Sequence, residues 1–378
     1  MSSSMEDPAA LAPDPIRNAV TTTRTERNWP MNCWWVVAHS SEVAGAPISR
    51  WALETPLVIY RKADGAPVAL HDRCPHRWAP LSMGWVEEDN IVCGYHGMQF
   101  SPAGQCVKFP TLKDEGPKIR IASYPVKERY NFVWVWLGDA EGADPELIPN
   151  DIAYMSDPGW HVVWGYKAVS ANYMQIKENV CDLSHFAFLH KNSAGVVGWD
   201  RLPWVKTEGE RVTFGLEFDM APLPPVYALP LGVELGTCAN RIDYTVHLSP
   251  GAVHGWSDIE SPHKKPGEDD TLQFYVAHLT TPVSASKCHY FWVFARNFGP
   301  PFDVDITRAA ADPVFNEDVR VLEATQAMTR RALDQEGAIE FSIASDRAAI
   351  EVRRSVARLV RAELEAEGAK SGQRKQPA

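Results

Sequence analysis

The sequence predicts an α+β protein of two domains, and three features of the chain support this prediction. Short segments rich in β-branched and aromatic residues, separated by turn clusters, run from Pro56 to Leu137 and are typical of a small antiparallel β domain. Residues 138–145 are rich in Gly, Asp and Pro, a composition that indicates a domain boundary. Strand-like segments and then helical patterns follow, which predicts a second domain with helices on one side of a sheet.

The chain of 378 residues is long enough for each domain to have its own core. We expect a disordered leader over residues 1–27, because this stretch is rich in Ala, Pro, Ser and Thr. The β domain is expected over residues 28–145 and the second domain over residues 146–367. A polar, flexible tail is expected over residues 368–378.

The pattern of apolar residues also predicts individual elements of the second domain. Alternation of apolar and polar residues indicates strands, and a spacing of three to four residues indicates helices. The predicted elements are strands over 211–219, 271–279 and 287–297, and helices around 172–190, from Val314 onward and over 346–367.

The composition excludes several kinds of partner. Lys and Arg number 37 against 48 Asp and Glu, and the net charge of −11 argues against nucleic acid and anionic membranes. We find no apolar run of the ~20 residues that a membrane span needs, and no N-terminal secretory signal. The odd number of cysteines, seven, argues against a disulfide scaffold and favours a reducing compartment. We therefore expect a cytoplasmic protein that binds neither nucleic acid nor membrane.

Four residues form the first motif that carries chemistry: Cys74, His76, Cys93 and His96. Two turns, each with one thiolate and one imidazole, would supply two sulfur and two nitrogen ligands. This set could hold a tetrahedral zinc ion, or a two-iron cluster of the Rieske type, in which two His replace two Cys on one iron. The sequences C-P-H-R and C-G-Y-H-G around these residues favour the two-iron cluster, because zinc fingers usually pair Cys with Cys in one knuckle.

The second motif contains Asp182, His185 and His190. On an ideal helix, two residues five positions apart diverge by ~140°. Both His can therefore bind one metal only if the helix bends, ends or carries a π-bulge near residues 186–189. A pair of His on a helix is more often packed or exposed than metal-bound. The first motif favours a metal site at these two His, because an electron-transfer cluster needs an electron acceptor.

A ferrous site with open positions needs a carboxylate beside two His. Asp318 is the best candidate, because it lies within the apolar stripe of the predicted helix that starts at Val314. Burial of a carboxylate there would cost several kcal/mol unless it were paired or bound to metal. Glu317 and Glu323, on other faces of the helix, are the alternatives.

The two motifs together, C-x-H-x16-C-x2-H and D-x2-H-x4-H, resemble those of the Rieske non-heme iron oxygenases, in their catalytic (large) subunit, over roughly residues 28–365. The pattern N-x-x-D-x-x-H from Asn179 to His185 is similar to that of the dicamba- and vanillate-type O- or N-demethylase branch, although Glu178 stands where we would expect Asp. The resemblance implies an N-terminal Rieske [2Fe-2S] domain and a C-terminal domain in which helices back an antiparallel sheet that carries a mononuclear Fe(II) site.

The resemblance also implies an assembly, a homotrimer in which one subunit's cluster lies beside the next subunit's iron. Asp182 is then expected to bridge His185 to His96 of the partner subunit. Asn179 is expected to contact the substrate or dioxygen. Electrons are expected from NAD(P)H through a ferredoxin and/or a flavin reductase, because we find no G-x-G-x-x-G after a predicted strand.

The resulting prediction is a terminal oxygenase that uses O2 to hydroxylate an O- or N-methyl carbon of a small aromatic compound, with release of formaldehyde, in aromatic catabolism. The first alternative is a ring cis-dihydroxylating dioxygenase, and the second is a Rieske electron carrier without oxygenase activity. His278 and Trp292 could line the substrate pocket, but a position in the core or at the surface is the more common one for such residues. Trp78, Trp85 and Tyr95 are expected to shield the cluster.

Overall fold

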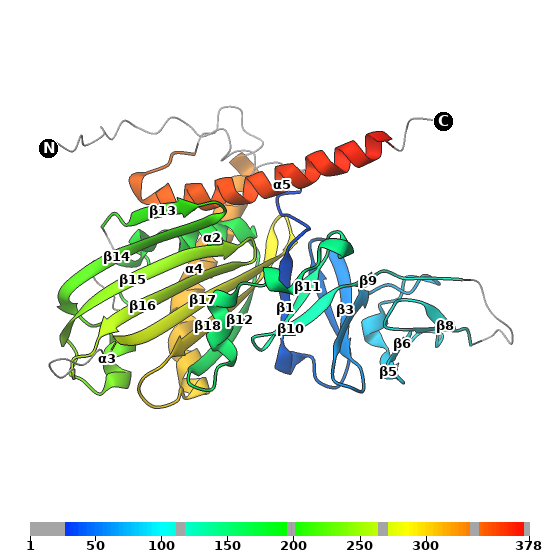
Figure 1. The fold of residues 1–378 in the computed structure, drawn as a ribbon, viewed down its shortest axis with the longest axis horizontal. Coiled ribbons are helices and arrows are strands. Elements are labelled where there is room, and N and C mark those ends of the chain that lie inside the picture. Colours follow the sequence, from blue (N-terminus) through cyan, green and yellow to red (C-terminus); the bar gives the residue numbers. More distant parts are fainter. Residues whose placement is uncertain are drawn as a thin grey trace.

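The computed structural model describes residues 27–110, 118–194, 198, 201–263, 271–332 and 340–373. Residues 1–26 of the predicted leader and the last five residues of the predicted tail therefore lie outside the described part. The chain forms an N-terminal β domain and a larger C-terminal domain, which lie end to end (Figure 1). The predicted α+β class, with an antiparallel sheet in each half, is confirmed.

The N-terminal domain consists of three small antiparallel sheets. Their strand orders are β1-β11-β10, β2-β3-β4-β9 and β5-β6-β7-β8. The strands are β1 (Trp34–His39), β2 (Ile48–Ala52), β3 (Thr55–Arg61), β4 (Pro67–His71), β5 (Trp85–Glu87), β6 (Asn90–Val92), β7 (Gln99–Phe100), β8 (Cys106–Lys108), β9 (Ser123–Tyr124), β10 (Val126–Arg129) and β11 (Phe132–Trp136). The β5–β8 sheet lies at the end of the molecule farthest from the C-terminal domain (Figure 1).

The C-terminal domain is built on one seven-stranded antiparallel sheet in the order β12-β18-β17-β16-β15-β14-β13. Its strands are β12 (His161–Val169), β13 (Trp204–Glu208), β14 (Arg211–Pro222), β15 (Cys238–Ser249), β16 (Ala252–Glu260), β17 (Thr271–Ser284) and β18 (Lys287–Arg296). Side chains of β18 alternate between two cores, Tyr290 and Trp292 in one and Phe291 and Val293 in the other. This alternation with a period of two residues follows from strand geometry and explains the almost continuous apolar sequence.

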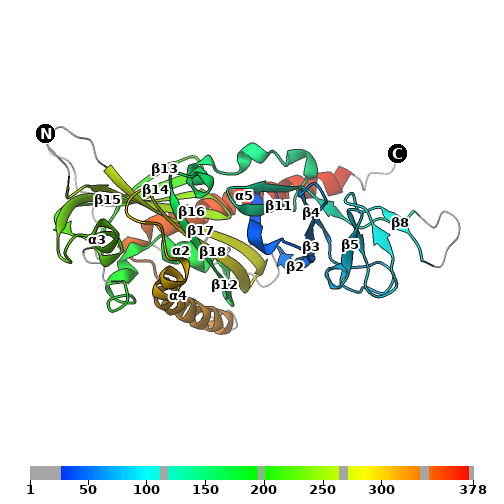
Figure 2. The same cartoon turned by 90° about the horizontal axis from the view of Figure 1, so that it is seen from below.

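Four described α-helices complete the C-terminal domain: α2 (Tyr173–Val180), α3 (Pro225–Leu231), α4 (Val304–Ala332) and α5 (Arg347–Gln373). Helices α2 and α4 lie on one face of the sheet, and α5 runs along its β13–β14 edge (Figures 1 and 2). Helix α4 begins ten residues before the predicted Val314 and continues through Pro313. Its first turn is held by Asp303, whose carboxylate accepts from the Ile306 N–H at 3.0 Å.

Short 3-10 turns join several of these elements: Ser40–Glu42, Leu81–Met83, Ala140–Gly142, Pro145–Leu147, Asn150–Ser156, Leu183–Ala187 and Ala344–Asp346. Two of them lie at the stretch where the sequence predicts a boundary, and Asp139 and Asp144 cap these turns through their side chains. Helix α5 continues past residue 367 to Gln373. One exposed glycine in a helix costs only ~1 kcal/mol relative to alanine, so Gly368 does not end it.

The two domains share a continuous core. Trp35 of β1 packs against Tyr173 of α2, with ring centroids 5.7 Å apart. The Leu53 N–H donates to the Pro282 carbonyl at 2.7 Å, and the Thr281 hydroxyl donates to the Val36 carbonyl at 2.5 Å. These contacts hold the domains in one fixed orientation. None of the described helices is long and apolar enough to cross a membrane.

Candidate metal centres and substrate cavity

The first motif lies on two loops of matching shape at the outer end of the N-terminal domain. In one loop, the Trp78 N–H donates to the Cys74 carbonyl at 2.8 Å, and in the other the Gly97 N–H donates to the Cys93 carbonyl at 2.9 Å. The fourth residue after each Cys has a positive φ, 57° at Trp78 and 75° at Gly97. The two loops are therefore equivalent knuckles, each of which presents one Cys and one His.

The four side chains of the knuckles meet, with the sulfurs inward and the rings outward. Cys74 and Cys93 are 2% and 1% exposed, whereas His76 and His96 are exposed, with ring centroids 4.6 Å apart. Burial raises the pKa of the Cys74 thiol to about 11, and the adjacent Cys93 adds to the rise. Two buried thiolates side by side need bound cations, so this donor set fits a cluster with one Cys-bound and one His-bound iron.

The three aromatic residues expected to shield the cluster differ in their contacts with its proposed ligands and in their exposure. The Tyr95 ring lies 3.8 Å from the His96 ring. Trp78 and Trp85 are 71% and 51% exposed, and the Trp78 ring lies under the guanidinium of Arg73 at 5.4 Å. This end of the domain thus presents imidazoles and aromatic rings to solvent.

The second motif meets the geometric requirement by a break in the helix. The helix predicted around residues 172–190 ends at Val180, earlier than the break expected near residues 186–189. Asp182 then caps a 3-10 turn, and its carboxylate accepts from the Ser184 N–H at 2.9 Å. A carboxylate that caps the next turn favours the new chain direction. The ring centroids of His185 and His190 consequently lie 5.0 Å apart.

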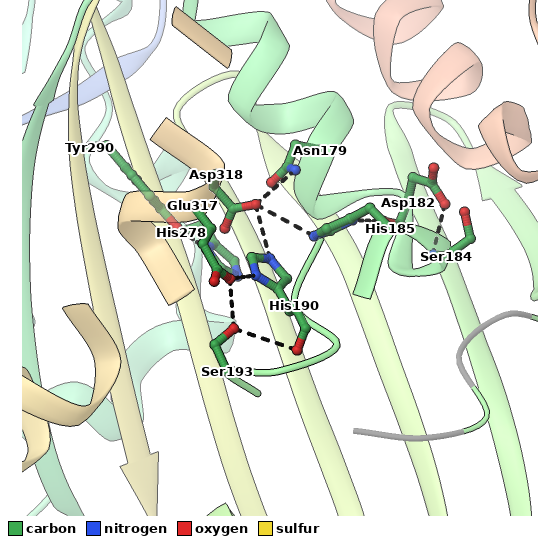
Figure 3. Close-up of polar contacts among 10 residues, drawn as sticks. All are labelled: Asn179, Asp182, Ser184, His185, His190, Ser193, His278, Tyr290, Glu317 and Asp318. Atoms are coloured by element: carbon green, nitrogen blue, oxygen red, sulfur yellow. Dashed lines mark hydrogen bonds and ion pairs between the residues drawn. The ribbon is translucent and has the colours of Figure 1, made fainter. Parts of the chain in front are cut away.

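Helix α4 brings Asp318 to the two His, as Figure 3 shows. Its Oδ1 lies 3.0 Å from Nε2 of His190 and 3.6 Å from Nε2 of His185. One ligand atom of each residue lies within 4.8 Å of the others. The His190 side chain is fully buried, and those of His185 and Asp318 are 17% and 13% exposed. Two imidazoles and a carboxylate around one point fit a ferrous ion.

Hydrogen bonds on the far sides of the rings orient both Nε2 atoms toward that point. Nδ1 of His185 donates to the Asp182 carbonyl. Nδ1 of His190 donates to Oε2 of Glu317 at 2.8 Å, and the Ser193 hydroxyl donates to the same oxygen at 2.6 Å. Such partners fix the tautomer and ring orientation of a metal-binding His. Glu317, an alternative ligand in the sequence analysis, thus contacts the opposite nitrogen of His190.

The other alternative, Glu323, lies elsewhere and accepts a hydrogen bond from the Ser170 N–H at 2.8 Å. Burial lowers the pKa of His185, although Asp318 acts in the opposite direction. At His190 burial also lowers the pKa, but Asp318 and Glu317 outweigh it and the pKa is raised. The carboxylates therefore attract positive charge at this point, as a metal site requires.

Asn179 and Asp182 lie on either side of the helix break. Nδ2 of Asn179 donates to Oδ1 of Asp318 at 3.1 Å, so Asn179 orients the carboxylate (Figure 3). Asp182, with His185, lines a depression of about 210 Å³.

A large cavity opens beside the proposed metal ligands. It has a volume of about 600 Å³, and Asn179, His185 and Asp318 form part of its wall. The wall is mainly apolar, as is usual for pockets that bind small organic molecules. His278 lines the cavity, the less favoured of its two positions in the sequence analysis, and its Nδ1 lies 2.7 Å from the Tyr290 hydroxyl.

Trp292 lies in the core, which the sequence analysis favoured over a position in the pocket. Trp292 is 1% exposed and stacks on Phe315 in the core, with ring centroids 4.9 Å apart. Its ring fills the space above Gly165 of β12, where a Cβ would lie 2.2 Å from it. The sequence analysis also missed Asp243, which lines the cavity. Polar residues at alternate positions of β15 (Asp243, Thr245 and His247) were the available signal.

The fold and the two sites together define a protein with a Rieske-type cluster site in one domain and a non-heme iron site in the next. Comparison with protein-family models gives two matches: the Rieske [2Fe-2S] domain over residues 33–125, and the vanillate O-demethylase oxygenase C-terminal domain over residues 169–362.

Individual relatives agree with this class. The chain is 32% identical to the dicamba O-demethylase oxygenase component of Stenotrophomonas maltophilia, over 87% of this chain and 97% of that protein. It is 31% identical to the vanillate O-demethylase oxygenase subunit of Pseudomonas sp. (strain HR199 / DSM 7063), over 89% and 97%. The crystal structure of dicamba monooxygenase with non-heme iron and dicamba matches with a TM-score of 0.76 and 30% identity, over 89% of this chain and 98% of that one.

The chain therefore belongs to the Rieske non-heme iron oxygenases, as an oxygenase component of the monooxygenase branch that includes the dicamba and vanillate O-demethylases. The expected enzyme class and the two expected cofactors, a [2Fe-2S] cluster and a mononuclear iron, are confirmed at this level.

Proposed function

We propose that this enzyme removes O- or N-linked methyl groups from aromatic compounds, as the terminal oxygenase of a multicomponent monooxygenase. The observation that carries the proposal is the apolar cavity of about 600 Å³, whose wall includes the proposed iron ligands His185 and Asp318. Relatives that match over most of the chain include two vanillate O-demethylase subunits and a chloroacetanilide N-alkylformylase. Hydroxylation of a methyl carbon on oxygen or nitrogen gives an unstable product that releases formaldehyde.

Each residue near the iron has a separate task in this proposal. His185, His190 and Asp318 would hold the iron, and three protein ligands leave coordination positions open. When bound, the iron activates dioxygen and the cluster bound by Cys74, His76, Cys93 and His96 supplies electrons.

Asn179, Glu317 and the Asp182 carbonyl hold the iron ligands in orientation, through the hydrogen bonds described above. The apolar wall limits the access of water to the reacting groups.

We further infer that the working form is a homotrimer in the cytoplasm, supplied with electrons by a ferredoxin or a flavin reductase. The exposed rings of His76 and His96 support transfer across a surface. The depression lined by Asp182 and His185 offers a place for such a surface next to the iron site. In this arrangement Asp182 would link His185 to His96 of the partner subunit. None of the seven cysteines forms a disulfide, which supports a reducing compartment.

The test of this function is product analysis with purified enzyme, a surrogate reductase and NADH on a panel of methoxy- and N-methyl-arenes. We expect formaldehyde and the demethylated arene in equal amounts. Formation of a ring cis-diol instead would support the dihydroxylating alternative. Oxidation of NADH without any oxygenated product from the panel would contradict the proposal. His185→Ala is the matched control, because it should abolish product and leave the cluster's visible absorbance.

A further inference from the structure

Three polar side chains of the cavity wall lie together: Tyr227 of α3, Asp243 of β15 and Ser257 of β16. We call them the polar cluster. All three are at most 5% exposed. The Ser257 hydroxyl donates to Oδ1 of Asp243 at 2.6 Å, and the Tyr227 hydroxyl oxygen lies 2.8 Å from Oγ of Ser257. These residues come from three elements that meet at one end of the cavity.

The charge of Asp243 is balanced by an arginine outside the cavity. Nε of Arg241 lies 3.0 Å from both oxygens of Asp243, and its guanidinium lies 4.0 Å from the ring centroid of Phe218. Nearby Arg296 donates to the Phe298 carbonyl and lies over Phe302, 4.3 Å from the ring centroid. Among the described residues that line the cavity, none is Lys or Arg. An anionic group at the end of the cavity with the polar cluster would therefore meet no Lys or Arg of the described wall, and it would face Asp243.

The hydrogen bonds of the polar cluster have a fixed direction. A serine hydroxyl has one proton, and Ser257 gives its proton to Asp243. Tyr227 must therefore donate to Ser257, so the phenol proton is also in use. The Tyr227 oxygen keeps its acceptor capacity. A ligand that reaches it must bring a donor, an O–H or an N–H group.

The polar cluster is distant from the iron end of the cavity. Ser257 and Val253 are four residues apart on β16, and Val253 is the cross-strand partner of His278. Four residues at about 3.4 Å each place these two levels of the sheet about 14 Å apart. His278 and Tyr290 belong to the iron end, where Asp318 influences the pKa of both (Figure 3). A molecule that contacts both ends must be longer than one benzene ring.

We propose that the cavity selects extended, uncharged compounds of two or more rings, with the oxidised methyl group at the iron end and a hydroxyl or N–H donor bound by Tyr227 at the other. This inference deepens the proposed function. It rests on that function only for the statement that a methyl group is oxidised. The binding preference itself depends on the polar cluster, on its distance from the iron end and on the described wall without Lys or Arg. Single-ring carboxylates, such as the dicamba bound in a related structure, are poorer ligands for this wall.

Isothermal titration calorimetry on anaerobic holoenzyme without reductase tests this preference, because no turnover occurs. The probes are 4′-methoxybiphenyl-4-ol, 4-methoxybiphenyl, 4,4′-dimethoxybiphenyl and 4′-methoxybiphenyl-4-carboxylate. We expect the phenol to bind about tenfold more tightly than the first two comparison compounds, the effect of one buried hydrogen bond. The carboxylate should bind most weakly. Equal affinity for all four probes, or tightest binding of the carboxylate, would overturn the inference.

Variants locate the effect at the polar cluster. Tyr227→Phe should remove the advantage of the phenol and leave the affinity for 4-methoxybiphenyl unchanged. Ser257→Ala frees the Tyr227 proton, so the phenol should lose its advantage over 4,4′-dimethoxybiphenyl, which carries only acceptors. Tyr166→Phe is the control, because its hydroxyl contacts Nδ1 of His289 at 2.8 Å, outside the cavity wall. An undiminished advantage of the phenol in both cluster variants would refute the role of Tyr227.

The two proposals fail in different ways. Absence of formaldehyde from every methoxyarene would remove the proposed demethylation, while the calorimetric ranking could still hold. A calorimetric ranking that favours the carboxylate would remove this inference, while formaldehyde could still form.

Discussion

Replacement of Glu317 by alanine removes the acceptor behind His190 and should weaken the iron site. Oε2 of Glu317 accepts from Nδ1 of His190 at 2.8 Å and from the Ser193 hydroxyl at 2.6 Å. The His190 side chain is fully buried and that of Glu317 is 27% exposed. Loss of such a partner lowers metal affinity by about 10- to 100-fold, or about 1.4–2.8 kcal/mol. Glu317→Gln keeps an acceptor oxygen and should lose less.

The assay is competition for ferrous iron between the protein and a chelator, with the visible absorbance of the cluster as an internal reference. Glu323→Ala is the matched control, because Glu323 lies on the same helix but bonds only the Ser170 N–H in the contacts described above. We expect it to keep the affinity of the intact enzyme. The reasoning would be refuted if Glu317→Ala held iron as tightly as the intact enzyme, or if Glu323→Ala lost iron to the same extent.

Three further predictions concern stability and assembly. Burial lowers the pKa of Lys177 to about 7, so between about pH 7 and pH 10.5 the unfolded chain binds a proton that the folded chain does not. This residue's contribution to stability therefore rises with pH, and the advantage of Lys177→Met in denaturant unfolding should shrink by about 2–3 kcal/mol from pH 7 to pH 9. Glu363→Ala should lower the free energy of unfolding by about 2 kcal/mol, because Glu363 accepts from the N–H groups of Met31 and Asn32 at 2.7 Å each. Glu367→Ala should change little, because Glu367 is 56% exposed and pairs with Arg27. Asp182→Asn should slow oxidation of the reduced cluster in single turnover and leave the iron content unchanged.

Each of these predictions has a contradicting outcome. A pH-independent difference between Lys177→Met and the intact chain would exclude the lowered pKa. Equal unfolding free energies for the two glutamate variants would show that Glu363 does not join the N-terminal segment to α5. An unchanged single-turnover rate in Asp182→Asn would remove the proposed link to the partner subunit.

The candidate ligands of both sites could be named from the sequence, whereas the way in which the fold brings them together could not. Cys74, His76, Cys93 and His96 are local signals, because each pair lies in one short loop. The His185–His190 pair was also visible, but the end of α2 at Val180 was not, because the capping role of Asp182 competes with an apolar pattern that suits a helix. The sequence analysis chose Asp318 over Glu317 because adjacent residues point about 100° apart around a helix, and Asp318 is the one that lies within the apolar stripe.

The far end of the cavity could not be predicted from the sequence. Tyr227, Asp243 and Ser257 are far apart in the chain and meet through the β15–β16 register and the position of α3. The sequence favoured a core position for Trp292 but could not name its neighbours. Its indole packs over Gly165, a contact that depends on the neighbouring strand β12.

Metal analysis of anaerobically purified enzyme, combined with electron paramagnetic resonance of the reduced protein, tests most directly that two separate iron centres lie in the two domains. The account predicts about three iron atoms per chain and a Rieske-type signal. Asp318→Ala should retain that signal with about two iron atoms, and Cys93→Ser should lose it. Zinc in place of iron, or loss of the signal in Asp318→Ala, would contradict the account.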